Sequence, residues 1–437
     1  MTTRQALLAL AIALGLAGAA RVPPAWADGA QRTASAISAA VDAEAPAAVD
    51  LLERLTTQNS GSFNRTGVEA VGRMLEAELK ALGFRTRWVP MDAIGRAPHL
   101  VAERDGGHGQ RLLLIGHMDT VFEPFHPFRK FTRNGDSATG PGVNDMKGGL
   151  VVMLSALKAL RAAGALDEAR ITVFITSDEE APGEPVEQSR RELVEIAKRS
   201  DATLCFESGI SRDGRDYASI GRRGFTGWRV ASEGRPGHSG GIFSAQQGDG
   251  AAFELSRVLS RFHDELREPN LTYNVGLMLG GANIKLEDAG IGSVAGKANI
   301  VPAEAQAIGD LRALTPAQVE RVRQRMREIV AASLPGTTST ISFEGAEYPP
   351  MEPTPRNAAL LARYSEASVA MGLPQVLTLD PLLRGAGDSA FVSPYVATIT
   401  GLGAVGQGAH AAGESVDLTR LPVQARRAAM LIRMLSR

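Results

Sequence analysis

The chain has one cysteine, few aromatic residues and almost no net charge. Its 437 residues include Cys205 as the single cysteine, so no disulfide can form within the chain. Aromatic residues make up 5% of the sequence and the formal net charge is −1. These values leave neither a basic field nor stacking side chains for nucleic acid, which we exclude as a partner. Cys205 lies within an apolar, strand-like segment, and we expect an inert core thiol.

Long apolar runs are also missing, except near the N-terminus. Residues 6–20 are apolar, follow Arg4 and are soon followed by a small-residue sequence, AWA. This pattern predicts a signal peptide over residues 1–27 and a mature chain that begins near Asp28. A membrane anchor is the alternative, but the run is short for a bilayer span. We therefore expect a periplasmic or secreted protein without a membrane partner after cleavage.

Two parts of the chain, 28–217 and 351–437, alternate apolar strand-like runs with helical segments. The strand-like runs are nearly all apolar, as in strands that are buried on both faces. Examples are RLLLIG, ITVFIT, ATLCF and YVATIT. The pattern predicts an α/β domain with a mostly parallel sheet and helices on both of its faces.

Residues 218–350 have a different hydrophobic pattern. Their strand-like segments are more amphipathic, which is typical of an antiparallel sheet with one covered face. The order of elements predicts an inserted α+β domain with a β-α-β-β-α-β arrangement. A domain interrupted in this way commonly carries its ligand site between the two parts.

Polar residues follow the ends of several predicted strands in the first domain. The candidates for metal binding or acid–base chemistry are His117, Asp119, Asp145, Glu179, Glu180, Glu207 and His410. Ligands of open α/β sheets bind at the carboxyl ends of the strands, so these side chains are expected to meet at one rim. Imidazole and carboxylate groups form a ligand set that suits Zn²⁺, and the number of groups favours two ions.

Eight motifs together resemble the M20 metallopeptidases, and within them the glutamate carboxypeptidase group. They occur in the family's order along the mature chain: GHMDTVF, GPGVNDMKGG, TSDEE, FES, RPGHSG, NIVPAEAQAIGDLR, GAGDSA and GAHAAGE. The resemblance implies two Zn²⁺ ions per subunit. One ion would be bound by His117 and Glu207, the other by Glu180 and His410, with Asp145 between them.

The resemblance also implies roles for residues that do not bind metal. Glu179 would be the general base and Asp119 would orient His117 through its second ring nitrogen. His238, often supplied by the partner subunit in this family, would stabilise the reaction oxyanion. Asn299 and Arg312 match family residues that hold the substrate's carboxylate or the oxyanion.

The resemblance further implies an amide hydrolase that forms a homodimer. Residues 28–217 and 351–437 would be its zinc catalytic domain, and 218–350 its lid and dimerisation domain. The substrate would be a small peptide or N-acyl amino acid, cleaved beside a C-terminal carboxylate, with release of glutamate or a similar residue. An aminoacylase or a di/tripeptidase of the same family is one alternative. A metal-containing solute-binding protein without activity is another.

Some positions depart from the family pattern. Glutamate-specific members carry a second Arg before a proline at the end of the inserted domain, where this chain has Tyr348. Arg384 either replaces that arginine in binding the substrate or pairs with Asp388. We expect Asp178, next to the two glutamates, to be a solvated loop residue. The G-x-G-x-x-G match at 401–406 is followed by no helical segment, so we interpret its glycines as allowing close backbone approach to the metal site.

Overall fold

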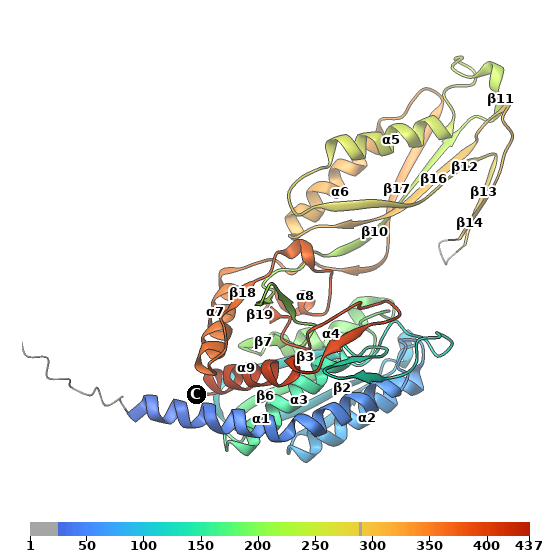
Figure 1. Ribbon diagram of the computed structural model, residues 1–437. Coiled ribbons are helices and arrows are strands. Elements are labelled where there is room, and N and C mark those ends of the chain that lie inside the picture. The colour runs from blue at the N-terminus through green and yellow to red at the C-terminus, as the bar shows by residue number, and fades with distance from the viewer. Residues whose placement is uncertain (1–24, 288–290) are drawn as a thin grey trace, which may run out of the picture.

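The computed structural model describes residues 25–287 and 291–437, which form two lobes joined by two chain crossings (Figure 1). The predicted signal peptide lies outside the described residues up to position 24. Helix α1, Ala25–Thr57, begins within the last residues of that predicted signal peptide. None of the helices in the described ranges combines the length and the hydropathy needed to cross a bilayer.

The first lobe is built on a six-stranded sheet with the order β1-β2-β6-β3-β7-β19. The strands are β1 Arg85–Val89, β2 His99–Asp105, β3 His108–His117, β6 Ala169–Thr176, β7 Ala202–Cys205 and β19 Ala397–Thr400. The neighbouring pairs β6–β3, β3–β7 and β7–β19 are parallel. The two pairs at the other edge, β1–β2 and β2–β6, are antiparallel. The α/β fold with parallel strands at its centre is as predicted.

Helices cover both faces of this sheet, so its central strand β3 is buried on both sides. Leu112 and Leu114 of β3 belong to one apolar cluster, whereas Leu113 and Ile115 belong to another. This alternation follows from the two-residue period of a strand. The first cluster lies against α1, α2, α3, α7 and α9, and the second against α4 and α8. Their bounds are α2 Arg65–Ala81, α3 Lys147–Ala162, α4 Val186–Ala197, α7 Pro355–Ala370, α8 Ser389–Val392 and α9 Arg420–Leu435.

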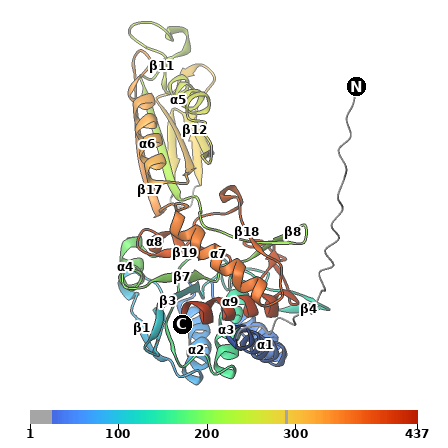
Figure 2. The same ribbon diagram turned by 90° about the vertical axis from the view of Figure 1, so that its left-hand side faces the viewer.

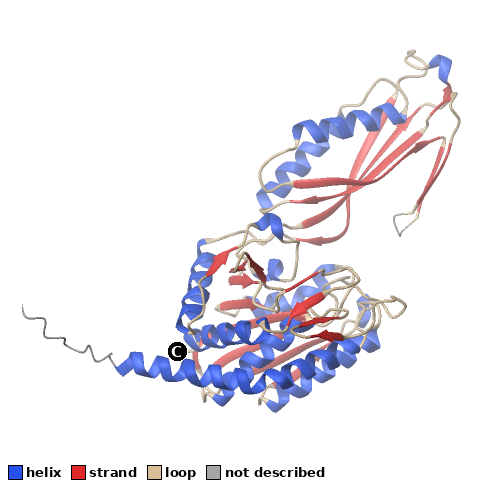
Figure 3. Cartoon of the chain, viewed as in Figure 1, coloured by secondary structure: helices blue, strands red, loops and turns tan. Residues whose placement is uncertain are grey.

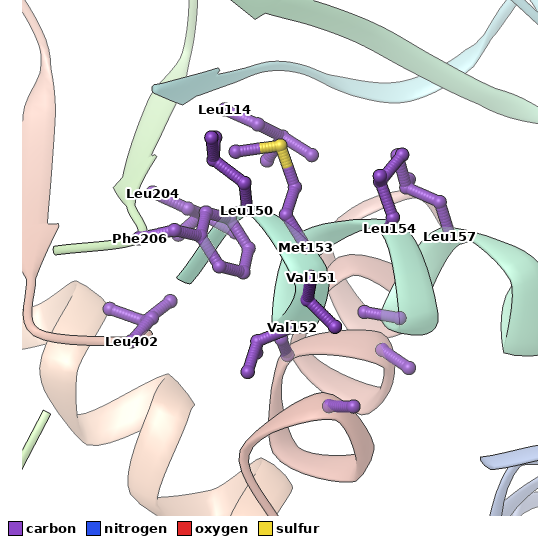
Figure 4. Close-up of a cluster of buried hydrophobic side chains, with 14 of the residues drawn as sticks. Leu114, Leu150, Val151, Val152, Met153, Leu154, Leu157, Leu204, Phe206 and Leu402 are labelled. Carbon is purple, nitrogen blue, oxygen red and sulfur yellow. The ribbon is translucent and has the colours of Figure 1, made fainter. Parts of the chain in front are cut away.

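Helix α3 is buried on nearly all sides, between the sheet and the helices α1 and α9. Figure 4 shows its leucine, valine and methionine side chains packed with Leu114, Leu204, Phe206 and Leu402. A helix that is apolar all round belongs in the centre of a domain. This packing fixes the start of α3, and the loop immediately before it carries Asp145.

The second lobe is the predicted β-α-β-β-α-β unit. Its antiparallel sheet has the order β12-β16-β10-β17 and two helices on one face (Figure 3). The elements are β10 Phe225–Gly234, α5 Ala251–Glu265, β12 Thr272–Gly281, β16 Glu304–Arg312, α6 Pro316–Ala331 and β17 Thr337–Tyr348. Trp228 of β10 and Phe262 of α5 meet edge to face, 5.8 Å apart, in a separate core. Helix α6 begins at a Thr-Pro pair, where the Thr315 hydroxyl accepts a bond from the amide of Gln318.

Short strands complete both lobes. In the second lobe they are β11 Gly237–His238, β13 Asn283–Leu286, β14 Gly292–Ala295 and β15 Ile300–Val301. In the first lobe they are β4 Thr132–Asn134, β5 Ser137–Thr139, β8 Ile210–Arg212, β9 Arg215–Ala218, β18 Val376–Thr378, β20 Gly406–Gln407 and β21 Ser415–Asp417. The second lobe extends away from the first in both views, with β11 at its far end (Figures 1 and 2).

Candidate metal centre

The predicted metal ligands meet at one rim of the six-stranded sheet, at the carboxyl ends of its parallel strands. His117 is the last residue of β3, and Glu207 follows β7 by two positions. Glu179 and Glu180 come from the loop after β6, and Asp145 from the loop before α3. His410 reaches the rim from the loop between the short strands β20 and β21. Strand β3 lies between β6 and β7, so His117 has candidate ligands from both neighbouring strands beside it.

The imidazole of His117 faces two carboxylates across a gap that suits a metal ion. Its Nε2 atom lies 3.4 Å from Asp145 Oδ1 and 3.5 Å from Glu207 Oε1. This nitrogen is buried and has no hydrogen-bond partner among the described residues. Two ligand atoms bonded to one tetrahedral zinc at about 2.1 Å lie roughly 3.4 Å apart. The observed spacing and the unpaired nitrogen therefore fit a zinc ion held by these three side chains.

His410 faces the other oxygen of the same aspartate. Its Nε2 lies 3.3 Å from Asp145 Oδ2 and 3.0 Å from Glu180 Oε2. Asp145 thus presents one oxygen to each histidine, which is the arrangement of a carboxylate that bridges two ions. His410 adopts a positive φ of 65°, an uncommon conformation that is tolerated where surrounding structure enforces it.

Burial and neighbouring charges shift the pKa values of the histidines and of the two adjacent glutamates in the cluster. Hydrogen bonds to Asp145 and Glu180 raise the pKa of His410 to about 11. Burial lowers the pKa of His117, but the neighbouring carboxylates of Asp119, Asp145 and Glu207 outweigh it and raise the pKa well above the usual range. Burial raises the pKa of Glu180 to about 7 and that of Glu179 well above its ordinary value. So many acids in one buried place require positive charge, and either protons or metal ions can provide it.

Asp119 holds the two sides of the cluster together. His117 Nδ1, the ring nitrogen that points away from the other carboxylates, bonds to the backbone carbonyl oxygen of Asp119 at 3.1 Å and lies 3.3 Å from its Oδ1. The same carboxylate accepts bonds of 3.0 Å from the amides of Glu179 and Glu180. Ser62 adds a hydroxyl bond of 2.6 Å. Asp119 therefore fixes the orientation of His117 through its carbonyl and carboxylate oxygens, and the course of the glutamate loop through the carboxylate.

Two supporting residues were not predicted from the sequence. Arg222 is buried, lies 3.3 Å from Glu207 Oε2 and donates to the carbonyl oxygens of Gly385 and Ala386. Burial would raise the pKa of Glu207, but the charge of Arg222 outweighs it and the pKa is lowered. No local pattern marks Arg222, because its partner is remote in the sequence.

Glu414 is the second supporting residue. It is fully buried and accepts bonds from the amides of Gly142, Asn144 and Asp145, at 2.7–3.1 Å. It thereby ties the loop of His410 to the loop of the bridging aspartate. Its position four residues after His410, within GAHAAGE, is a signal that sequence reasoning could have used.

The interpretation of Asp178 as a solvated residue is wrong. Its side chain is fully buried and lies 2.5 Å from Nη1 of Arg190, which is itself buried. Arg190 also binds Asp388 at 2.7 Å, and Asp388 accepts a bond from the hydroxyl of Thr176. The pairing of Arg384 with Asp388 that the sequence left open is therefore not formed.

Arg384 instead lies beside Gly401 and close enough to Arg222, Glu207 and Asp145 for their charges to act on it. A Cβ atom added to Gly401 would lie 3.3 Å from its Nη2, and its Nε is buried without a hydrogen-bond partner among the described residues. Burial and the neighbouring charge of Arg222 lower the pKa of Arg384 to about 10, while Glu207 and Asp145 act in the opposite direction. Gly403, in the same glycine-rich run, passes so close to the backbone that a Cβ would lie 2.1 Å from the Phe206 carbonyl oxygen. A short strand rather than a helix follows this run.

The predicted substrate residues of the second lobe lie at its two ends. Arg312 ends β16 beside the first lobe, where a Cβ added to Gly385 would lie 3.5 Å from its Nη1. His238 is exposed on β11 at the far end, and the Asn299 carbonyl accepts a bond from the amide of Ser239 next to it (Figure 1). Within one chain, His238 and Asn299 are therefore together but remote from the metal ligands.

Comparisons with known proteins identify the family of the chain. Residues 113–434 match peptidase family M20/M25/M40, which is more than half of the chain. Carboxypeptidase G2 of Pseudomonas sp. (strain RS-16) is 32% identical over 285 residues, which cover 65% of this chain and 64% of that protein. A succinyl-diaminopimelate desuccinylase of Methylocella silvestris is 26% identical over 372 residues, or 80% of this chain and 87% of its own length. The match to carboxypeptidase G2 thus covers less than two thirds of that protein.

Solved structures share the fold at low sequence identity. A tripeptidase of Staphylococcus aureus superposes with a TM-score of 0.67 at 18% identity, covering 89% of this chain and 98% of that one. An M20 family metallo-carboxypeptidase of Sulfolobus solfataricus gives a TM-score of 0.63 at 17% identity, covering 89% and 99%. The resemblance found in the motifs is thereby confirmed, and the chain belongs to peptidase family M20/M25/M40.

Proposed function

We propose that this chain is a dinuclear zinc hydrolase that cleaves an amide bond next to a free carboxylate. In this proposal it is a carboxypeptidase that releases C-terminal glutamate or a similar residue from small peptides or N-acyl amino acids. The observation that carries it is Asp145, whose two oxygens face His117 and His410 separately. We also propose export to the periplasm or outside the cell, on the evidence of the sequence pattern in residues 1–27.

Two zinc ions would be held by the five ligands in two sets that share Asp145. When bound, a zinc pair brings the pKa of a coordinated water towards roughly 7 and polarises the scissile carbonyl. The relative carboxypeptidase G2 and the desuccinylases support an amide substrate, since their names describe removal of an acyl or amino acid group.

Glu179 is the proton carrier in this proposal. It belongs to the same cluster as His117 and Glu207, and the ligand atoms of the three lie within 4.8 Å of one another. Burial and the neighbouring acids raise its pKa, whereas His117 lowers it. A carboxylate with a raised pKa can take a proton from the attacking water and pass it to the leaving nitrogen.

Arginines beside the metal ligands support a preference for a substrate with carboxylates. The loop 384–386 lies between Arg222, which binds its carbonyl oxygens, and Arg312, which approaches Gly385. The Nε atom of Arg384 is buried and has no hydrogen-bond partner among the described residues. A planar guanidinium binds a carboxylate through two parallel bonds, so Arg384 is the residue proposed to bind an acidic substrate side chain.

A second copy of the chain would complete the site. His238 has an exposed imidazole, and it lies at the end of the second lobe that is remote from its own metal ligands. Strand β12 is an edge strand of the second lobe and exposes Val275 and Met278. An exposed apolar edge strand is a site where a second chain can pair. We propose a homodimer in which His238 of one subunit stabilises the oxyanion in the site of the other.

The roles of the two adjacent glutamates are separable by mutation. Glu179→Gln is expected to keep the zinc content of the wild type and to lose about 10²–10⁴-fold in kcat, because a general base contributes about that much. Glu180→Ala is expected to lose zinc. Metal analysis and initial rates test both, with the exposed Glu187→Gln as a matched control that keeps full activity. Wild-type kcat in Glu179→Gln would contradict the general-base role.

Arg222 is expected to set zinc affinity through Glu207. Arg222→Met leaves Glu207 without its buried counter-charge, and loss of such a supporting partner typically weakens metal binding about 10–100-fold. Competition with a chelator of known affinity measures the effect. The control is Arg223→Met, because Arg223 bonds to Thr272 and Leu382 instead of a metal ligand. Equal zinc affinity in both variants would show that Arg222 does not support the site.

Substrate preference tests the role of Arg384. Wild-type protein is expected to have a higher kcat/KM for an N-acyl-glutamate than for an N-acyl-leucine or a dipeptide with a free amine. Arg384→Met is expected to reduce this preference about 10–100-fold, the value of a hydrogen bond to a charged group. A wild-type preference for N-acyl-leucine would favour an aminoacylase, a preference for the dipeptide a di/tripeptidase, and tight binding without turnover a solute-binding protein.

Mixing two inactive variants tests the shared site. His238→Ala and Glu179→Gln are each expected to be inactive, but a heterodimer has one site with Glu179 from one chain and His238 from the other. Random reassociation at equal amounts is expected to restore about a quarter of wild-type activity, because half of the dimers are mixed and each has one intact site. Light scattering establishes the dimer first. No recovery in a proven dimer would contradict the role of His238 across subunits.

A further inference from the structure

The two chain crossings between the lobes each contain or directly follow a residue whose side chain contacts a residue of the metal centre. The first crossing follows β9 and carries Arg222, and the second follows β17, whose last residue is Tyr348. The crossings pair with each other, since Arg222 and Met351 exchange both of their backbone hydrogen bonds. Arg222 contacts the ligand Glu207, as described above. Tyr348 contacts the residue proposed as general base.

Tyr348 holds the main chain of Glu179. Its hydroxyl donates a bond of 2.7 Å to the Glu179 carbonyl oxygen and accepts one of 3.0 Å from Nη2 of Arg190. The ring is buried and packs edge to face on Phe391 at 5.2 Å. Burial raises the pKa of Tyr348 well above its usual range, so the hydroxyl remains a donor at neutral pH.

Arg190 fixes the position of the Tyr348 hydroxyl. Its guanidinium is fully buried, and its other nitrogens bind Asp388 and Asp178, at 2.7 and 2.5 Å. A guanidinium bound to two buried carboxylates has no freedom to move. The Tyr348 hydroxyl is therefore held in place by the first lobe, although the residue belongs to the last strand of the second lobe.

Glu179 is consequently held on both sides of its Cα atom. Its amide donates to Asp119, which orients the ligand His117, and its carbonyl accepts from Tyr348. The side chain that moves the proton is thus placed by one contact from the metal side and one from the crossing between the lobes. Displacement of a catalytic group by about 1 Å can lower a rate about 10²-fold, so such contacts affect catalysis directly.

We propose that Tyr348 is a positioning residue for Glu179, by which the crossing between the lobes sets the place of the general base. The inference rests on the proposed function, in which Glu179 transfers the proton. A purely structural role for the Tyr348 hydroxyl is the alternative. That role predicts a loss of stability without a selective change in kcat.

The test compares two buried tyrosines that differ in their hydroxyl contacts. Tyr348→Phe keeps the ring on Phe391 but removes both hydroxyl bonds. Tyr364→Phe is the matched control, because Tyr364 is also buried and its hydroxyl has no hydrogen-bond partner among the described residues. Zinc content, the thermal midpoint, kcat and KM are measured for the purified full chain with the substrate that the wild type cleaves best.

Tyr348→Phe is expected to lower kcat about tenfold, to change KM less than about twofold and to keep the zinc content, because Glu179 is misplaced while ligands and substrate contacts remain. Tyr364→Phe is expected to match the wild type. Wild-type kcat in Tyr348→Phe, or an equal fall of kcat in both variants, would overturn the inference. So would a change confined to KM.

A second variant keeps the test decisive if Tyr348→Phe does not fold. Phe391→Leu removes the ring that supports Tyr348 and leaves every hydrogen bond of the network possible. A fall in kcat of about threefold at constant KM is then expected, because Tyr348 is less firmly held. Unchanged kcat in Phe391→Leu would then count against the inference. Glu179→Gln in the same assay separates the two levels: if it retains activity the proposed function fails, and if it is inactive the tests on Tyr348 and Phe391 judge the positioning role alone.

Discussion

The mutual repulsion of acids at one rim of a sheet is the constraint on which this molecule depends. Asp145, Glu207 and the adjacent pair Glu179 and Glu180 come from three separate loops but meet beside two histidines. Carboxylates in such a place are costly unless positive charge lies among them. Two observations reflect this need for positive charge. The pKa of His410 is raised by the acids beside it, and the Nε2 atom of His117 faces acids without a hydrogen-bond partner in the described part of the chain. The fold supplies the geometry, because parallel strands deliver their carboxyl ends to one place.

A second layer of contacts keeps these acids from moving apart. Asp119 joins His117 to the glutamate loop, Glu414 joins the loops of Asp145 and His410, and Arg222 holds Glu207. All three are buried, so their interactions are screened little by solvent. Each of them links segments that are far apart in the sequence. The order of the metal centre therefore depends on the packing of the whole first lobe, including the buried helix α3, whose start fixes the end of the Asp145 loop.

The sequence predicted those features that local patterns specify. Apolar runs and helical periodicity were sufficient for the α/β lobe and the inserted β-α-β-β-α-β lobe, and polar residues at strand ends indicated the rim. The partners of buried charges were not predictable in this way. Asp178 looked like one more loop acid because its counter-charge, Arg190, follows a loop and the first turn of helix α4. Arg222 and Tyr348 likewise act on residues 15 and 169 positions away, and no spacing rule connects them.

The position of the second lobe gives the crossings between lobes a particular importance. Strand β16 ends at Arg312 beside the first lobe, whereas His238 lies at the far end of the second lobe, so that lobe presents different residues at its two ends. Any change in its angle must be absorbed at the paired crossings around Arg222 and Met351, because these are the segments that join it to the first lobe. Those segments already hold Glu207 through Arg222 and Glu179 through Tyr348. The crossings can bend without displacing Glu207 and Glu179 only if Arg222 and Tyr348 are bound more tightly to the first lobe than to the second. The two carboxylates bound to Arg190, and the two carbonyl oxygens bound to Arg222, provide that hold.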